Sequence, residues 1–171
     1  RLAKQIAREP GNVVTIQSAE NVVVDGFEIR NSGGSSAGVY AKNGEFVLRN
    51  CDVHDCYRGV YVISGTGTSV DGDAVIEYCT IHDNDAVGVV INNPNNPQAY
   101  ILWSAIYNNA SNGIYAYSEP TEITNCTVAY NGAAGIDFRS SSGDAFTNNV
   151  VASNTGYGIT CTSATPCGSS G

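Results

Sequence analysis

The sequence predicts an all-β fold, a parallel β-helix in which one chain winds through about six rungs. A unit best seen at Thr121 to Phe138 (TEITNCTVAYNGAAGIDF) recurs along the chain. Within each unit apolar residues alternate with polar ones, which is the period of a β-strand and not of a helix. A repeat in the low twenties is too short for a strand plus a helix, so each turn is expected to consist of short strands joined by bends.

Aligning the six units produces columns of like residues, and a β-helix converts each column into a ladder along its axis. The inner aliphatic column contains Ile29, Val53, Ile81, Ile106, Val128 and Val151. A Gly-aliphatic pair follows in each unit, beginning at Gly38, Gly59, Gly88, Gly113, Gly135 and Gly158. These pairs are 21, 29, 25, 22 and 23 residues apart, which predicts regular rungs interrupted by inserted loops.

Three segments are predicted along the chain. Residues 1–12 form an N-terminal lead-in or cap, residues 13–161 form the β-helix, and residues 162–171 form a C-terminal tail. Two insertions, at 64–73 and 92–98, are rich in turn residues and follow the same strand in consecutive rungs. They are expected to project side by side, either as part of a binding site or as solvated loops.

Charge and hydropathy restrict the partners. Sixteen acidic and eight basic side chains give a net charge of −8, which argues against nucleic acid and anionic membranes as partners. No run of about 18 apolar residues is present, so no membrane insertion is predicted.

Five of the six cysteines fall into two groups. Cys51, Cys79 and Cys126 share an inward column and are expected to be small core residues. Cys51 and Cys79 lie within reach of each other on adjacent rungs, but their parallel side chains aim the sulfurs poorly, so the pairing of these three and of Cys56 stays open. Cys161 and Cys167 bracket a short bend, and a disulfide between them would favour an extracellular location.

A column of asparagines lies near the bend between the two halves of each unit. Asparagine tolerates left-handed backbone conformations and bonds to nearby backbone groups, and stacked amides can bond to each other. A structural ladder is therefore predicted, with Cys56 in the place of the second rung. Its members are Asn31, Asn84, Asn109, Asn131 and Asn154.

The two histidines, His54 and His82, occupy one outward column on adjacent rungs. Together with Arg58 they are the candidate catalytic residues. Calcium prefers several carboxylate and carbonyl oxygens, and a candidate calcium site is predicted from neighbouring acids. Its ligands would be Asp55, Asp83 and Asp85. The alternative is a solvated face with ordinary titration.

Outward aromatic residues form the other candidate site, for binding carbohydrate or a protein partner. Its residues are Tyr40, Tyr61, Tyr115, Tyr117 and Trp103. The first three share a column directly after the Gly-aliphatic pairs, and Trp103 lies beside Tyr78 at a strand boundary. Exposed rings stack on sugar faces or bury against a partner, although tyrosine is also simply a good strand residue.

The run NVVVDGFEIRNSGG at residues 21–34, with the later NCxV and NGxxGI runs, resembles rungs of the right-handed parallel β-helix proteins in the pectate-lyase-like superfamily. The resemblance implies a right-handed, secreted fold. That superfamily includes polysaccharide lyases, glycoside hydrolases and non-catalytic surface proteins, so it does not define an activity. The Asn-Thr-Asp, Asp-Asp, Gly-His-Gly and Arg-Ile-Lys motifs of polygalacturonases do not occur here.

These observations predict a secreted or cell-surface β-helix module with a structural, adhesive or carbohydrate-binding role, capable of self-assembly. Its expected partners are polysaccharide or other copies of itself. The alternative is a small polysaccharide lyase or glycoside hydrolase domain that acts on acidic glycans, with Ca²⁺ as its one candidate cofactor.

Overall fold

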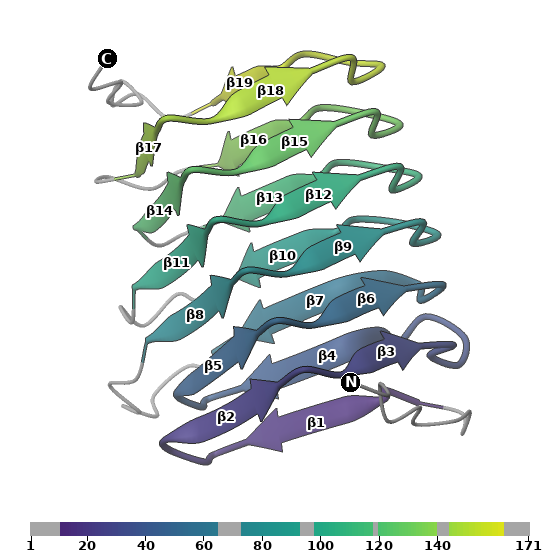
Figure 1. Cartoon of the computed structure of the whole chain (residues 1–171), viewed down its shortest axis with the longest axis vertical. Helices are drawn as coiled ribbons and strands as arrows, with labels where there is room; N and C mark the ends of the chain where they lie inside the picture. The colour runs from purple at the N-terminus through teal and green to yellow at the C-terminus, as the bar shows by residue number, and fades with distance from the viewer. Residues whose placement is uncertain (1–10, 65–72, 93–97, 118–119, 140–143, 163–171) are drawn as a thin grey trace.

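The computed structural model describes residues 11–64, 73–92, 98–117, 120–139 and 144–162. In this part of the chain there is no helix, and short strands stack into rungs along one axis (Figure 1). Each rung contributes one strand to each of three sheets, and every strand pairs in parallel with its counterpart in the next rung. The predicted parallel β-helix is confirmed, with six rungs and one additional strand before the first.

The three sheets are named here in the order in which the chain visits them within a rung. Sheet 1 contains β2 (Val22–Asp25), β5 (Phe46–Arg49), β8 (Ala74–Glu77), β11 (Ala99–Leu102), β14 (Thr121–Thr124) and β17 (Ala145–Thr147). Sheet 2 contains β3 (Glu28–Arg30), β6 (Asp52–His54), β9 (Thr80–His82), β12 (Ala105–Tyr107), β15 (Thr127–Ala129) and β18 (Val150–Ala152). Sheet 3 contains β1 (Val14–Gln17), β4 (Ala37–Lys42), β7 (Arg58–Ile63), β10 (Val89–Asn92), β13 (Ile114–Tyr117), β16 (Ile136–Arg139) and β19 (Ile159–Cys161).

The described strands of the β-helix extend from Val14 to Cys161. The proposed cap at 1–10 and the tail at 163–171 lie outside the described residues, as do most of the two predicted insertions. Within the described ranges, no helix is available that could cross a membrane.

The core lies inside the coil and consists of stacked aliphatic side chains. Ile29, Val53, Ile81, Ile106 and Val128 succeed one another in register and are fully buried. Each such side chain contributes roughly 1.5–3 kcal/mol by leaving water. Because successive side chains of a strand point to opposite faces, these residues point inward and their strand neighbours point outward. The alternation of apolar and polar residues in the sequence therefore predicts the strands and their buried face.

Each rung turns at two single-residue bends with a left-handed backbone. Between sheets 1 and 2 the bend residues are Gly26, Asn50, Tyr78, Trp103, Asn125 and Asn148. Between sheets 2 and 3 they are Asn31, Asp55, Asp83, Asn108, Tyr130 and Ser153. Asn, Asp and Gly tolerate this conformation at low cost, which explains the abundance of asparagine.

The asparagine ladder follows the second bend by one residue, so its predicted first member was wrong. Asn31 is a bend residue, and its backbone pairs with that of Asp55. Ser32 takes the ladder position in the first rung, where its hydroxyl accepts a hydrogen bond from the Tyr57 backbone N–H. The ladder residues proper do not have a left-handed backbone, because the preceding residue makes the bend.

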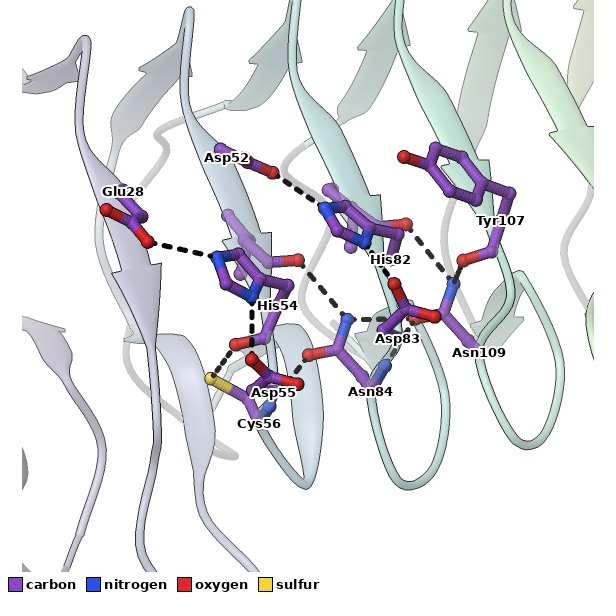
Figure 2. A network of polar contacts seen from close by, with 12 residues as sticks. Glu28, Asp52, His54, Asp55, Cys56, His82, Asp83, Asn84, Tyr107 and Asn109 are labelled. Atoms are coloured by element: carbon purple, nitrogen blue, oxygen red, sulfur yellow. Dashed lines mark hydrogen bonds and ion pairs between the residues drawn. The ribbon is translucent and has the colours of Figure 1, made fainter. Parts of the chain in front are cut away.

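The ladder amides of Asn84, Asn109, Asn131 and Asn154 connect consecutive rungs. Figure 2 shows the first two of them. Nδ2 of Asn84 donates to Oδ1 of Asn109 at 2.8 Å, and Nδ2 of Asn109 donates to Oδ1 of Asn131 at 3.0 Å. Each amide also donates to a carbonyl of the preceding rung, as Asn109 does to Ile81. Asn84, Asn109 and Asn131 are almost fully buried, so the ladder satisfies backbone groups that water does not reach.

The glycine column provides the space for this ladder. A Cβ on Gly88 would lie 2.8 Å from Nδ2 of Asn109 and 2.7 Å from the carbonyl oxygen of Gly113. Gly59, Gly113 and Gly135 are equally crowded, and none has a left-handed backbone. Close packing against the ladder, and not backbone conformation, therefore requires glycine here.

Candidate functional site

The histidine strip lies on sheet 2 and is a stack of three rings (Figure 2). The imidazoles of His54 and His82 are stacked with centroids 5.1 Å apart, and Tyr107 covers the other face of His82 at 5.0 Å. The three residues are in register on β6, β9 and β12. Their common outward column was predicted for the histidines, but the participation of Tyr107 was not.

Each imidazole nitrogen in the strip faces a carboxylate. Nδ1 of His54 lies 2.9 Å from Oδ2 of Asp55, and its Nε2 lies 3.4 Å from Oε1 of Glu28 in the preceding rung. The second histidine repeats this pattern, with Nδ1 of His82 2.6 Å from Asp83 and Nε2 3.0 Å from Asp52. An imidazole can donate to both acids only when both of its nitrogens carry a proton.

This geometry leaves the imidazoles poorly placed to act as a base. A general base needs a nitrogen within hydrogen-bonding reach of the substrate proton. Both nitrogens of His54 and His82 are occupied by acids, and their side chains are only 14% and 17% exposed. The acids also give the strip a negative electrostatic potential. Burial raises the pKa of Tyr107, and the charges of Asp52 and Asp83 raise that pKa further.

Two predictions about this strip were wrong. Arg58 belongs to β7 on sheet 3, where its guanidinium lies 5.0 Å from the centroid of the Tyr61 ring and donates to the carbonyl of Ser35. The predicted calcium ligands do not gather either, because Asp55 and Asp83 each turn toward the neighbouring histidine. No group of three or more His, Cys, Asp or Glu that could hold a metal ion occurs among the described residues.

The predicted tyrosine column is on sheet 3 and encloses a slot. Tyr40 and Tyr61 are in register and form an edge-to-face pair with centroids 5.7 Å apart. The next rung carries Val90 in this column and the one after it carries Tyr115. Since a valine side chain is far smaller than a tyrosine ring, a cavity of about 350 Å³ opens over Val90 between Tyr61 and Tyr115.

Polar groups also line the slot. They are supplied by Arg58, Asn92, Ser111 and Asn112. Arg58 forms no ion pair with a carboxylate of the described residues, whereas Arg139 at the far wall binds Asp137 and has its pKa raised by that hydrogen bond. Among the described residues, the slot therefore contains one cation without a carboxylate partner.

Trp103 lies beside Tyr78 at a strand boundary, as the sequence predicts, and not in the tyrosine column. It is at the bend between sheets 1 and 2, stacked on Tyr78 with centroids 5.2 Å apart and 5° between the ring planes. Tyr117 does belong to sheet 3, where it stacks on Tyr115 at 6.4 Å. The aromatic residues thus form two separate surfaces.

The cysteines of the core column serve the bend between sheets 1 and 2. Each sulfur lies within hydrogen-bonding distance of the carbonyl two residues earlier and of one in the preceding rung, as the sulfur of Cys126 does for Thr124 and Ile101. Ser104 makes the equivalent short-range bond in the rung where cysteine is absent. The thiols of Cys51, Cys56, Cys79 and Cys126 are free and buried. Cys161 is disulfide-bonded, while Cys167 lies outside the described residues, so its predicted pairing stays a prediction.

We expect the thiols of Cys56 and Cys126 to resist alkylation in the folded protein. Burial raises the pKa of Cys56 and of Cys126, which keeps them protonated, and both are almost inaccessible to reagent. Labelling with iodoacetamide at pH 8, followed by mass spectrometry, should proceed only at the rate of unfolding and become rapid in urea. Rapid labelling of these thiols without denaturant would contradict the buried placement.

The fold and the ladders define this chain as a parallel β-solenoid. A family described as "Right handed beta helix region" matches residues 12–168, nearly the whole chain, and the protein belongs to that family. This agrees with the predicted handedness and is consistent with the pectate-lyase-like superfamily. No curated protein and no solved structure matches the chain.

Proposed function

We propose that this β-helix module binds saccharide in the slot on sheet 3, without turnover. The observation that carries the proposal is the pair of tyrosine walls over a valine floor. Tyr61 and Tyr115 stand two rungs apart, about 10 Å at a strand spacing of about 4.8 Å. A sugar ring presents an apolar C–H face to an aromatic ring, and its hydroxyls need the polar groups that line the slot.

The Arg58 guanidinium, which has no carboxylate partner among the described residues, favours an acidic saccharide. A guanidinium forms paired hydrogen bonds to a carboxylate, and these are stronger than bonds between neutral groups. Arg58 is already oriented by its contact with Tyr61 and its bond to Ser35, so little freedom is lost on binding. The histidine strip adds no evidence for catalysis, because both of its imidazoles are occupied by carboxylates.

The slot can be tested by filling it. In Val90→Phe a ring would occupy the space between the tyrosine walls, and we expect saccharide binding to be lost while the fold is kept. Tyr115→Ser should weaken binding about fivefold, because each aromatic contact contributes about 1 kcal/mol. Isothermal titration with pectate, alginate, glycosaminoglycan and neutral oligosaccharides measures both effects. Tyr157→Ser, in an exposed residue outside the slot, is the control.

Two further measurements separate the alternatives. Arg58→Gln should lower the affinity for an acidic saccharide and leave the affinity for a neutral saccharide unchanged. Absorbance of unsaturated uronate, followed with and without Ca²⁺ and in the double variant His82→Ala, Asp83→Ala, tests for a lyase. A Ca²⁺-dependent rise that this variant abolishes would support the enzymatic alternative. Saccharide binding that Val90→Phe does not change would contradict the proposed site.

A further inference from the structure

The bend between sheets 1 and 2 contains two residues that its backbone disfavours. In four rungs the left-handed position is held by glycine or asparagine. In the other two it is held by Tyr78 and Trp103, with φ of 53° and 46°. Bulky side chains rarely adopt this conformation, and such outliers concentrate where a surface is used.

These two residues gain no burial in exchange. Tyr78 is 54% exposed and Trp103 is 47% exposed, and their rings stack mainly on each other. The bend therefore presents two parallel aromatic rings to solvent. Asparagine at both positions would suit the backbone better, which makes a binding role for the rings the simplest explanation.

A groove adjoins the Tyr78 ring on the side opposite Trp103. Its volume is about 460 Å³. Apart from Tyr78 and Thr80, the residues that line it come from the two preceding rungs, with Gly26 and Asn50 at the equivalent bend positions. Since these side chains are absent or short, one face of the tyrosine ring forms a wall of the groove.

The groove is acidic. Glu28 and Asp52 line it from β3 and β6, in register on adjacent rungs. Glu28 uses only Oε1 toward Arg30 and His54, and Asp52 uses only Oδ1 toward His82. The second oxygen of each carboxylate bonds to none of the described residues and can accept from a ligand.

We propose that this groove binds a protonated amino sugar. The C–H face of the pyranose would stack on Tyr78, and its ammonium group would lie against Glu28 and Asp52, where the tyrosine π-face also favours a cation. The Asn50 amide and the Thr80 hydroxyl are placed to bond to sugar hydroxyls, which favours a saccharide over a basic peptide. This site is separate from the slot on sheet 3 and opposite to it in charge, so neither proposal depends on the other.

The test compares saccharides that differ in the substituent at C2, which is cationic only in glucosamine. Tetramers of glucosamine, of N-acetylglucosamine and of glucose are titrated at pH 6, with tetralysine as the peptide. Trp103 is the sole tryptophan and stacks on the groove wall, so its fluorescence reports on this site. We expect binding of the glucosamine tetramer, at least about tenfold weaker binding of the other two saccharides, and weakening by salt.

Matched variants separate binding from folding. Tyr78→Asn introduces the residue that other rungs use at this bend, so the stability of the protein should be kept or raised. The affinity for the glucosamine tetramer should fall about tenfold. Asp52→Asn should lower the affinity for this tetramer to a similar extent. Tyr61→Ser, which changes the slot on sheet 3, should leave that affinity unchanged. Equal affinity for the amine and acetylated tetramers, unchanged affinity in Tyr78→Asn, or binding of tetralysine alone would each overturn the proposal.

Discussion

Replacing Gly113 with alanine is expected to destabilise the protein by roughly 3 kcal/mol, an unusually large effect for one methyl group. The new Cβ would lie 2.6 Å from Cγ1 of Val128, 2.7 Å from Nδ2 of Asn131 and 2.7 Å from the carbonyl oxygen of Gly135. The first atom belongs to a stiff core side chain, the second to the ladder, and the third to the backbone. None can move away without breaking contacts in the next rung.

The same column contains its own control. Gly158 occupies the equivalent position in the last rung, and a Cβ there would meet nothing closer than Val151 at 3.7 Å. Gly158→Ala should be neutral or slightly stabilising, because alanine restricts the unfolded chain. Urea unfolding followed by circular dichroism and by Trp103 fluorescence measures both variants. Similar midpoints for the two variants would show that space along this column is not limiting.

The repeat made the fold predictable because each of its columns has a physical cause that acts in every rung. The inner aliphatic column arises from core burial, and the glycine column from the close approach of strand and ladder. Six copies of the same constraints leave little freedom for another architecture. Loop insertions changed the spacing without disturbing the columns.

The site was harder to predict because the bends decide where a side chain points. Asn31 and Asn84 look equivalent in sequence, but the bend residue and the ladder residue are adjacent, and asparagine suits both. Arg58 follows His54 by only four residues, and the intervening bend carries it onto another sheet. A sequence alignment by columns does not specify these directions.

Contacts between rungs were also inaccessible to the sequence. The pairing of His82 with Asp52 joins residues 30 positions apart, and it depends on the orientation of the imidazole. The slot exists because Val90 interrupts a tyrosine column, a signal that was visible in the alignment. The small size of Val90 between two tyrosines in that column indicates the slot.

Replacing Asn109 with aspartate changes one NH₂ group to an oxygen and is expected to cost roughly 4 kcal/mol at pH 7. Nδ2 of Asn109 faces three acceptors, the carbonyls of Ile81 and Tyr107 and Oδ1 of Asn131, at 3.0–3.2 Å. A carboxylate oxygen in that place would meet three oxygens and no donor. The side chain is 1% exposed, so water cannot relieve the repulsion.

The pH dependence of this loss has a definite sign. Burial among acceptors favours the neutral acid, so the folded-state pKa of the introduced carboxyl group should lie above its unfolded value of about 3.9. The penalty relative to the parent protein is therefore smallest below about pH 3.9, where the protonated acid donates one hydrogen bond, and it grows as the pH rises. Asn108→Asp, in the adjacent exposed bend residue, should stay within about 0.5 kcal/mol throughout. Urea midpoints of all three proteins at pH 4 and pH 7 test this, and an equal loss for the two variants would show that the ladder amides do not hold the rungs together.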